Sequence, residues 1–464
     1  MSSFHSVSVL CLFLGLLTLL PERASWGAGK QPTIVVFLSD DHSQRDSGVY
    51  GAKDIKTPEM ERIAKEGLVF THAFVASPSC APSRSAMLTS LMPARNGAEA
   101  NHTFKRQEVP SMINGLRDLG YEVAAFGKVA HGKGAKRYDF DHIDGRYDLD
   151  TVRSYVSNRT SEKPLCLFIG THDPHVPWAA QSTYQPDSVS LPAKLLDTPQ
   201  TRISRGQYYT DVTNADRELG EIYSFANRHF PQNLLFLYSS DHGAQWPFGK
   251  WNLYDEGIRV PLICVWKGRV APGRTNAMVQ WIDLLPTLME CGGGKTPLGI
   301  DGRSFLGVLF GKEEKHRDAI FTTHHNDGDK NIYPSRSVRT MKFKYIRNLH
   351  PEWAHTTHID QGGGSGDGWR YFQEWVTSAI NNEHAKNIVD RYYRRPAEEL
   401  YDLESDPEET KNLAANPNYV SELGKMRQML DQWLSTQQES PVTATPKPLS
   451  QPETWMFKPR TPTP

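Results

Sequence analysis

The stretch Thr33-Ile-Val-Val-Phe-Leu-Ser39, followed directly by Asp40-Asp41, decides the fold class of this chain. Its unbroken run of β-branched and apolar residues is typical of a strand that is buried on both faces, as in a parallel sheet. A helix-forming segment follows at residues 58–66. Because parallel strands are joined by crossover connections that are usually helical, this pair of segments predicts an α/β fold.

Strand-like and helix-like segments continue to alternate after this first strand. Apolar runs typical of buried strands recur at residues 122–126, 165–169 and 234–238. Helical composition is found at residues 83–91, 110–119 and 208–227. This alternation predicts a layered α/β sheet, and we assign residues 28–330 to that domain.

The pattern changes after about residue 330. Lys342-Phe-Lys-Tyr-Ile-Arg347 alternates between polar and apolar residues, as a half-buried antiparallel strand does. A helix-like segment follows at residues 419–433. We therefore predict a smaller C-terminal α+β subdomain over residues 331–436, and a Pro- and Thr-rich extended tail over residues 437–464.

Charge and composition exclude several classes of protein. The 464 residues include 52 Lys and Arg against 53 Asp and Glu, which gives a formal net charge of −1. Without a global basic field the chain has no general attraction for a nucleic-acid backbone, so we predict no nucleic-acid partner. Aromatic residues make up 10% of the chain, enough for a large core, which excludes a disordered or collagen-like protein. A local cationic pocket remains compatible with this neutral average.

The N-terminal segment resembles an export signal. Residues 7–20 are mostly apolar but fall short of the roughly 20 residues that a membrane span needs. Ser25-Trp26-Gly27 then supplies small residues where a signal peptidase cleaves. We predict a signal peptide over residues 1–27 and an exported protein, periplasmic or extracellular (lysosomal in a eukaryote), with no stable membrane insertion. The alternatives are a buried strand or an uncleaved anchor.

The five cysteines do not form the pattern of a disulfide framework: Cys11, Cys80, Cys166, Cys264 and Cys291. Cys166 and Cys264 lie inside apolar strand-like runs and are expected to be packing residues. Cys80 differs, because it lies in a loop beside proline, serine and arginine.

Polar residues follow four of the predicted strands at the point where each strand ends. They are Asp40-Asp41, Lys128, His172-Asp173 and Asp241-His242. In open α/β sheets, ligands bind beyond the carboxyl ends of the parallel strands. If the four strands are parallel, these side chains meet at one rim of the sheet.

Four residues of this rim predict a metal site: Asp40, Asp41, Asp241 and His242. Three carboxylates held close together repel one another unless a cation neutralises them. Their oxygens suit Ca²⁺ or Mg²⁺, while the imidazole leaves Mn²⁺ or Zn²⁺ open. The alternative is that the first pair caps a helix and the second forms an ordinary turn.

Cys80-Ala-Pro-Ser-Arg84 precedes a helix-forming segment. Pro82 suits the first turn of a helix, which places Cys80 at the positive end of the helix dipole. A low-pKa thiolate nucleophile beside Arg84 is one interpretation, and a small capping residue is the other.

This segment is similar to the Cys-x-Pro-Ser-Arg maturation signature of type I sulfatases, in the alkaline-phosphatase superfamily. In the same order the chain contains Asp40-Asp41, Gly127-Lys128, His172-Asp-Pro-His175 and Ser240-Asp-His-Gly243. The resemblance extends from about residue 31 to residue 436. It implies an alkaline-phosphatase/sulfatase-like sandwich, in which a large mixed, mostly parallel sheet is flanked by helices and joined to a smaller C-terminal α+β subdomain.

The resemblance also implies roles for the rim residues. Cys80 would be oxidised to formylglycine by a formylglycine-generating or anaerobic sulfatase-maturating enzyme, and its hydrated aldehyde would be the nucleophile. One divalent ion, expected to be Ca²⁺, would be held by Asp40, Asp41, Cys80 in its modified form, Asp241 and His242. Cations on Arg84 and Lys128 would hold the aldehyde hydrate and the sulfate oxygens. Asp241 would act as a base, His172 or Lys250 would protonate the leaving group, and His131 would take a proton from the second hydroxyl.

Two departures from the family pattern are similar to iduronate 2-sulfatases. His242 stands where many sulfatases have asparagine, and His131 lies one residue further from Lys128 than is common. Other segments resemble heparan N-sulfatases: 172–175, 246–254, 333–339, 390–395 and 399–402. Lys250 replaces an arginine of that branch, which keeps the charge but loses the bidentate fork. The polar segment His324-His325-Asn326-Asp327 and Arg336 are expected to line the sugar site, or else to form a solvated polar loop.

We therefore expect a sulfuric ester or sulfamate hydrolase that removes sulfate from glycosaminoglycan-like saccharides, as heparan N-sulfatases do. The alternatives on the same scaffold are an O-sulfatase for another sulfated polysaccharide and a phosphonate or phosphodiester hydrolase. A hydrolase that uses the Cys80 thiol directly is a further alternative, and a non-catalytic polyanion-binding protein is an alternative of another class.

Overall fold

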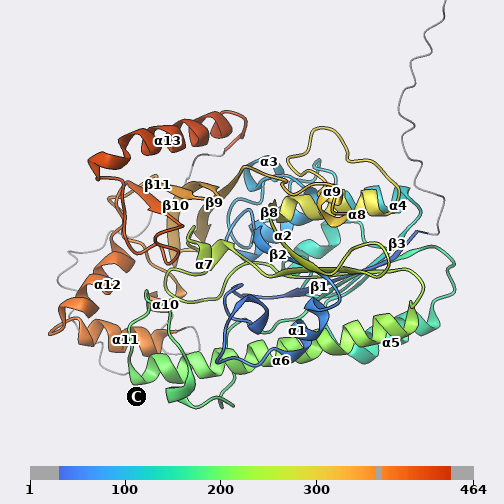
Figure 1. Ribbon diagram of the computed structural model, residues 1–464, viewed down its shortest axis with the longest axis horizontal. Coiled ribbons are helices and arrows are strands. Elements are labelled where there is room, and N and C mark those ends of the chain that lie inside the picture. The colour runs from blue at the N-terminus through green and yellow to red at the C-terminus, as the bar shows by residue number, and fades with distance from the viewer. Residues whose placement is uncertain (1–30, 362–367, 440, 442–464) are drawn as a thin grey trace, which may run out of the picture.

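The computed structural model describes residues 31–361, 368–439 and 441 (Figure 1). The predicted signal peptide and nearly all of the predicted tail lie outside the described residues. Within the described part, no helix has both the length and the apolar character needed to cross a bilayer.

The larger of two sheets has eight strands in the order β4-β3-β5-β1-β6-β7-β2-β8. The strands are β1 (Thr33–Ser39), β2 (Leu68–Phe74), β3 (Glu122–Gly127), β4 (His142–Asp144), β5 (Leu165–Gly170), β6 (Leu234–Ser240), β7 (Leu262–Trp266) and β8 (Gly273–Gln280). β1 lies at the centre and pairs in parallel with β5 and β6, and β3 pairs in parallel with β5. β7 runs antiparallel to β6 and β2, so the sheet is mixed but mostly parallel, as expected.

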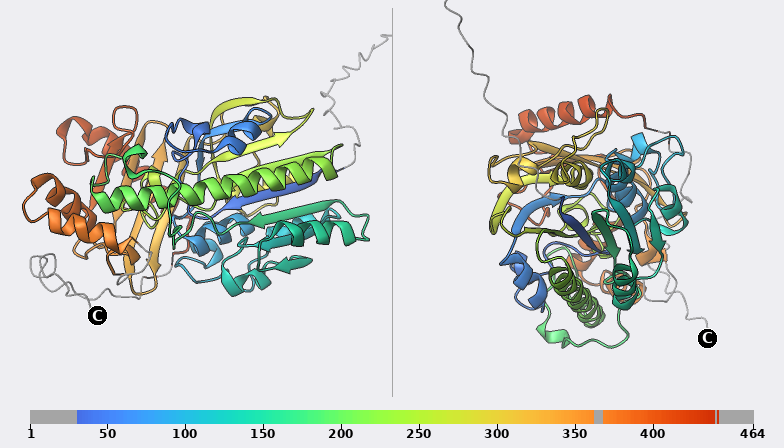
Figure 2. Two further views of the ribbon diagram at one scale, coloured as in Figure 1. Left: turned by 90° about the horizontal axis from the view of Figure 1, so that it is seen from below. Right: turned by 90° about the vertical axis from the view of Figure 1, so that its right-hand side faces the viewer.

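Helices cover both faces of this sheet (Figures 1 and 2). One face carries α1 (Pro58–Ala64), α5 (Leu149–Asn158) and the long α6 (Pro199–His229). The other carries α2 (Cys80–Thr89), α3 (Pro93–Asn96), α4 (Met112–Asp118), α8 (Leu284–Cys291) and α9 (Leu306–Leu309). Alternate residues of β1 enter the two layers: Ile34, Val36 and Leu38 pack with one core, and Val35 and Phe37 with the other. This burial on both faces explains the unbroken apolar run of β1.

The second sheet is antiparallel throughout, in the order β12-β11-β10-β9. Its strands are β9 (Ala319–Asp327), β10 (Asn331–Thr340), β11 (Phe343–Asn348) and β12 (Glu398–Asp402). Helix α13 (Val420–Leu434) packs Leu423, Met426 and Leu430 on this sheet, and the remaining helices here are α10 (His358–Gln361), α11 (Trp369–Ser378) and α12 (Glu383–Tyr393). The C-terminal α+β subdomain is therefore present. It begins at β9, so the boundary predicted after residue 330 falls inside the β9–β10 hairpin.

Short elements complete the described chain. They are α7 (Asp255–Ile258) and the 3₁₀ turns η1 (Gly48–Tyr50), η2 (Gly132–Arg137), η3 (Pro186–Ser188), η4 (Trp281–Asp283) and η5 (Pro417–Tyr419).

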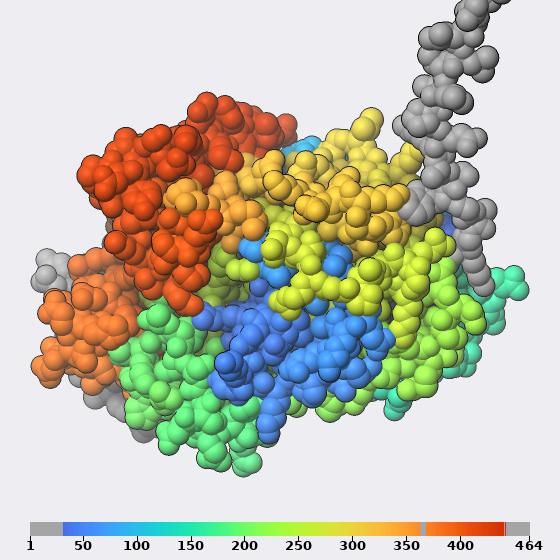
Figure 3. Space-filling model, viewed as in Figure 1, coloured from blue at the N-terminus to red at the C-terminus, as the bar shows by residue number. Residues whose placement is uncertain are grey.

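Buried charges join the two sheets. Asp255 of α7 accepts a hydrogen bond from Arg339 Nε of β10 at 3.0 Å and one from Lys344 Nζ of β11 at 2.6 Å. Lys344 also lies 2.7 Å from Glu409. In Figure 3 the C-terminal residues pack directly against the end of the first domain. The second sheet is thus fixed relative to the first, which allows its residues to contribute to a shared site.

Candidate active site

The carboxyl ends of β1, β3 and β6 bring their polar residues to one rim, as the parallel arrangement requires. Asp40 and Asp41 follow β1, Lys128 follows β3, and Asp241 and His242 follow β6. The backbone N–H of Asp41 donates to Asp241 Oδ1 at 3.0 Å. Asp41 has φ of 65°, in the left-handed region that a non-glycine residue adopts at a cost. The turn after β1 is therefore held in an unusual conformation that directs the Asp41 carboxylate into the rim.

Four side chains of the rim form a group that could hold a metal ion. One ligand atom from each of Asp41, Cys80, Asp241 and His242 lies within 4.8 Å of the others, and all four residues are buried. His242 Nε2 lies 3.3 Å from Cys80 Sγ and 3.3 Å from Asp41 Oδ1. Asp41 Oδ1 is buried and accepts no hydrogen bond from any described residue. Buried carboxylate oxygens with one imidazole fit a divalent cation.

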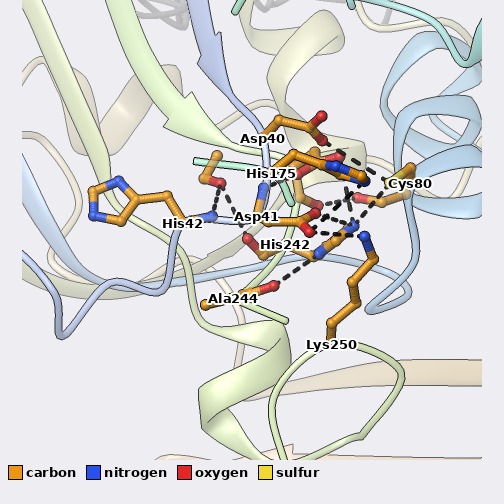
Figure 4. Close-up of polar contacts among 12 residues, drawn as sticks. Asp40, Asp41, His42, Cys80, His175, His242, Ala244 and Lys250 are labelled. Atoms are coloured by element: carbon orange, nitrogen blue, oxygen red, sulfur yellow. Dashed lines mark hydrogen bonds and ion pairs between the residues drawn. The ribbon is translucent and has the colours of Figure 1, made fainter. Parts of the chain in front are cut away.

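Figure 4 shows that the side chains of Asp41, Cys80 and His242 point toward one another from different segments. His42, the next residue in the chain, points away and bonds through Nδ1 to Tyr238 Oη at 2.8 Å. Asp41 therefore belongs to the group that could hold a metal ion, and the adjacent His42 does not.

Asp40 lies at the edge of this group. Its Oδ1 accepts a hydrogen bond from Arg84 Nη2 at 3.1 Å and lies 3.9 Å from Cys80 Sγ, and its other oxygen pairs with Lys128 Nζ. Burial would raise the pKa of the Asp40 carboxyl, but Lys128 and Arg84 hold it below its usual range. Asp40 therefore remains ionised in a fully buried position.

Three cations balance the carboxylates, and all three were predicted from the sequence. Arg84 is fully buried, and its Nε donates to Asp241 Oδ2 at 2.9 Å. Lys250 Nζ donates to Asp41 Oδ2 at 2.7 Å. Lys128, which follows β3, is the third cation and pairs with Asp40. A rim that gathers three cations in a nearly neutral chain is suited to an anionic ligand.

Cys80 is the first residue of α2, directly after the N-cap residue Ser79, as expected from Pro82. Burial would raise the pKa of the Cys80 thiol, but Lys128, Lys250 and His242 lower it well below its usual value. Burial alone raises the pKa of Cys264 to about 12 and makes that thiol inert. Cys166 and Cys264 belong to the apolar core, so their predicted packing role is confirmed. Among the described cysteines, only Cys80 has a thiol pKa that its surroundings lower.

Both histidines of the His172-Asp-Pro-His175 motif lie near the charged groups of the rim, and His175 is the more buried of the two. His175 Nε2 lies 4.0 Å from Asp41 Oδ2, whereas the His172 side chain is exposed. The two residues are joined in a turn, because the backbone N–H of His175 donates to the carbonyl of His172 at 2.8 Å. The assignment of His172 from the sequence stays a prediction, and His175 is a second candidate for the same role.

His131 reaches the rim beside a residue that the sequence did not single out. Its Nε2 lies 2.8 Å from Nδ1 of His102, and His102 Nε2 lies 3.2 Å from Asp327 Oδ1. His131 also contributes to the lowered pKa of the Cys80 thiol. The expectation that ligands bind beyond the carboxyl ends of parallel strands predicts neither residue. His102 follows no strand, and Asp327 belongs to the second, antiparallel sheet. The one available signal was the polar segment 324–327, whose last residue is Asp327.

His324, His325 and Arg336, which were predicted for the sugar site, contact residues away from the rim. His324 is buried and bonds through Nε2 to Asn331, and His325 Nε2 lies 3.1 Å from Glu99 Oε2. Arg336 is 1% exposed and donates to His325 Nε2 at 2.6 Å. The alternative of a solvated polar loop is wrong, because all three residues are buried. Their polar atoms are occupied by partners around β9 and β10, so a sugar-lining role has no support from the geometry.

Comparisons with known proteins agree with this site. Residues 32–146 and 145–294 match the model of the sulfatase family, and residues 242–356 match that of the N-sulphoglucosamine sulphohydrolase C-terminal domain. The chain is 34% identical to an ulvan-active sulfatase of Formosa agariphila, over 90% of this chain and 82% of that one. It is 26% identical to human N-sulphoglucosamine sulphohydrolase, over 87% of this chain and 90% of that one.

Solved structures share the fold. One was determined in complex with its substrate D-glucosamine-2-N,6-O-disulfate; it aligns with a TM-score of 0.67 and 18% identity, over 88% of this chain and 98% of that one. A second, described as a putative sulfatase from Bacteroides thetaiotaomicron, aligns with a TM-score of 0.62 and 20% identity, over 88% of this chain and 93% of that one. At these identities the likeness concerns the fold alone.

Proposed function

The chain belongs to the sulfatase family, and from that premise we propose that it hydrolyses sulfate groups on glycosaminoglycan-like saccharides, with N-sulfated glucosamine as the preferred substrate. The observation that carries this proposal is the convergence of Arg84, Lys128 and Lys250 on a buried rim that also contains Cys80. The match of residues 242–356 to the N-sulphoglucosamine sulphohydrolase C-terminal domain supports the choice of sugar.

We propose that this rim holds one divalent cation, with Ca²⁺ as the expected ion. Asp41, Asp241 and His242 would be ligands, with residue 80, and Asp40 would complete the set from the edge of the group. The Oδ1 atom of Asp41, which is buried and accepts no hydrogen bond from the described residues, supports this assignment. A bound cation would neutralise negative charge on the sulfuryl group as it is transferred.

We further propose that a maturation enzyme oxidises Cys80 to formylglycine. The modified residue would supply a hydrated aldehyde, which offers a hydroxyl nucleophile that a thiol lacks. The position at the start of α2, beside three cations, suits an oxygen nucleophile as well as a thiolate. The direct use of the thiol remains the competing proposal, and it predicts inactivation by alkylating reagents.

The remaining residues handle charge and protons. Arg84 and Lys128 would bind sulfate oxygens, and Lys250 would add a third cation that is buried to 2% exposure. His175 lies at the rim beside Asp41 and would donate a proton to the leaving group, together with Lys250. His131, which interacts with residue 80, would accept a proton from its second hydroxyl.

The second candidate is an O-sulfatase for another polysaccharide, which the 34% identity to an ulvan-active sulfatase favours. A phosphonate or phosphodiester hydrolase and a non-catalytic polyanion-binding protein are the remaining alternatives. Export from the cytoplasm stays a proposal that rests on residues 1–27, and N-terminal sequencing of the protein from its native host would test it.

The test is sulfate release by protein from its native host, or by protein produced together with a maturation enzyme. The substrates are matched disaccharides that carry sulfate on the glucosamine nitrogen, on oxygen, or not at all, with a phosphodiester for comparison. We expect fastest release from the N-sulfated sugar, loss of activity with a chelator, and no activity in a Cys80→Ala variant. Faster release from O-sulfated saccharides would favour the second candidate, and binding without release would favour the non-catalytic alternative.

A further inference from the structure

A chain of hydrogen bonds runs from the second sheet to the catalytic rim. It begins at Asp327, the last residue of β9, whose Oδ1 lies 3.2 Å from His102 Nε2. His102 Nδ1 in turn lies 2.8 Å from His131 Nε2. The Asp327 side chain is 4% exposed, whereas that of His102 is 62% exposed. A buried carboxylate thus holds an exposed imidazole, which in turn holds His131 beside residue 80.

The partners of Asp327 fix the direction of these bonds. Its Oδ2 accepts from Trp251 Nε1 at 2.7 Å and from Asn101 Nδ2 at 2.8 Å. The indole N–H can only donate. Asn101 cannot exchange its amide atoms without a loss, because its Oδ1 accepts from the backbone N–H of Ala81 at 3.0 Å. An ionised carboxylate only accepts, so Oδ1 must receive the N–H of His102 Nε2.

The tautomers of both histidines follow from this direction. A neutral imidazole has one N–H and one lone pair, so His102 with a proton on Nε2 must accept at Nδ1. His131 then donates from Nε2 and carries no proton on Nδ1. That Nδ1 atom is buried and is not engaged by any other histidine or carboxylate of the described residues, and the His131 side chain lies close enough to Cys80 to affect its thiol. Its lone pair is available to the nucleophile at residue 80.

The backbone around His102 is built for this arrangement. His102 has φ of 61°, a left-handed conformation that most non-glycine residues avoid and that surrounding structure must maintain. The preceding residue supplies the support, because the N–H of Asn101 donates to the carbonyl of Asn326 at 2.9 Å. Asn101 therefore ties together the start of α2, the His102 loop and the end of β9.

We propose that Asp327 is a positioning residue of the active site: through His102 it fixes the tautomer of His131, so that an unprotonated Nδ1 faces residue 80. This inference rests on the proposed function only in the use that it gives to His131. Through Asp327, the second sheet would contribute a residue that positions the catalytic histidine.

The geometry predicts an unusual effect of Asp327→Asn. Trp251 and Asn101 would hold the amide oxygen of the new side chain, which turns its NH₂ group toward His102. His102 would then accept at Nε2 and donate from Nδ1, and His131 would be forced to carry its proton on Nδ1. The substitution therefore reverses the whole chain of bonds rather than only weakening it.

The first readout needs no activity and no modified residue. The Cys80→Ala protein, in which no thiolate competes for the proton of His131, is labelled with ¹⁵N-histidine and studied by long-range ¹H–¹⁵N correlation at about pH 8.5, roughly two units above the ordinary histidine pKa. The Asp327→Asn substitution is made in the same Cys80→Ala background. We expect unprotonated Nδ1 shifts for His102 and His131 where Asp327 is kept, and a protonated Nδ1 at both in Asp327→Asn. Signals are assigned with His102→Ala and His131→Asn. A protonated Nδ1 on His131 where Asp327 is kept overturns the proposal, even if the Asp327→Asn variant fails to fold.

The second readout is turnover by matured enzyme. We expect Asp327→Asn to lower kcat by about 10²–10⁴-fold with little change in KM, as when a catalytic histidine is locked in the wrong tautomer. The double variant Asp327→Asn/His102→Ala should be more active than the single variant, because it frees His131 from the wrong donor. Asp329→Asn, an exposed change in the same hairpin, is the matched control and should resemble the wild type.

The outcomes separate the two proposals. A double variant no more active than Asp327→Asn, or identical His131 shifts with and without the substitution, contradicts the positioning role. A wild type that releases no sulfate contradicts the proposed function, whereas the ¹⁵N shifts would still decide the tautomer of His131.

Discussion

The ammonium group of Lys250 lies 2.7 Å from Asp41 Oδ2, and both side chains are buried at the rim of the larger sheet. This pair joins the loop after β6 to the carboxyl end of β1. It places a cation beside the group of residues proposed to hold the metal, where the oxygens of a sulfate would bind.

Loss of the Lys250 charge should reduce turnover more than binding. We expect Lys250→Met to lower kcat by about 10²–10³-fold, as removal of one donor to a developing oxyanion does. Lys250→Arg should keep more activity, because it keeps the charge. Initial rates on an N-sulfated disaccharide measure both variants, and a Lys250→Met enzyme with wild-type kcat would remove Lys250 from the mechanism.

The two histidines of the motif at 172–175 should differ in their response to leaving groups. We expect His175→Ala to slow release from a saccharide by about 10²–10⁴-fold, the usual contribution of a general acid. An aryl sulfate needs little protonation of its leaving group, so its hydrolysis should fall much less. His172→Ala, the paired variant, should cause the smaller loss on the saccharide. A larger loss for His172→Ala would favour the assignment made from the sequence.

A cation bound at the rim should stabilise the folded protein. A ligand at 100 times its dissociation constant adds about 2.7 kcal/mol to the free energy of unfolding. We therefore expect a chelator to lower Tm and abolish activity, and added Ca²⁺ to restore both. Asp241→Asn, which weakens the site, should make Tm insensitive to Ca²⁺. The proposal of a metal site would not survive a wild type whose Tm and activity ignore the chelator.

The buried charges between the two sheets should be essential for stability. Lys344→Met leaves Asp255 and Glu409 without their shared cation, and we expect a loss of about 3–5 kcal/mol. Arg427→Met is the matched control, because its pair with Glu398 is exposed and should contribute at most about 1 kcal/mol. Urea unfolding measures both, and equal losses would contradict the role given to burial.

The same buried charges should make the stability of the folded protein depend on pH. Although burial alone would raise the pKa of the Asp255 carboxyl, Arg339 and Lys344 hold it well below its ordinary value of about 3.9. A carboxyl with a lowered pKa contributes stability above its unfolded pKa, and that contribution is lost as the pH falls toward the folded value. We expect the wild type to lose stability below about pH 4, and Asp255→Asn to lose less over that range. Parallel curves for the two proteins would exclude Asp255 as a cause.

The sequence was sufficient where the signal is local. The apolar runs at β1, β3, β5 and β6 predicted parallel strands, and the polar residues after three of them form the rim. The positions of strands and of strand ends follow from periodicity and burial, which neighbouring residues determine. The antiparallel β7 and the position of β2 between β7 and β8 depend on pairing between distant segments, and no local pattern encodes such pairing.

The contacts that the sequence did not predict have the same explanation. Asn101 and Asp327 are 226 positions apart, and they meet only because the second sheet packs against the first. His102 adopts its left-handed conformation in a loop whose sequence gives no sign of it. His172 and His175 lie in one motif, and only the folded chain shows that His175 is the more buried of the two. These features depend on tertiary structure.

The central claim is that residue 80 of the working enzyme is no longer a cysteine. Tandem mass spectrometry of the peptide that contains residue 80, from protein purified from its native host, tests this directly. We predict the mass decrease expected when the –CH₂SH group of Cys80 becomes an aldehyde, in a fraction of molecules that rises and falls with specific activity. A fully active preparation in which Cys80 is entirely an unmodified thiol would contradict the account.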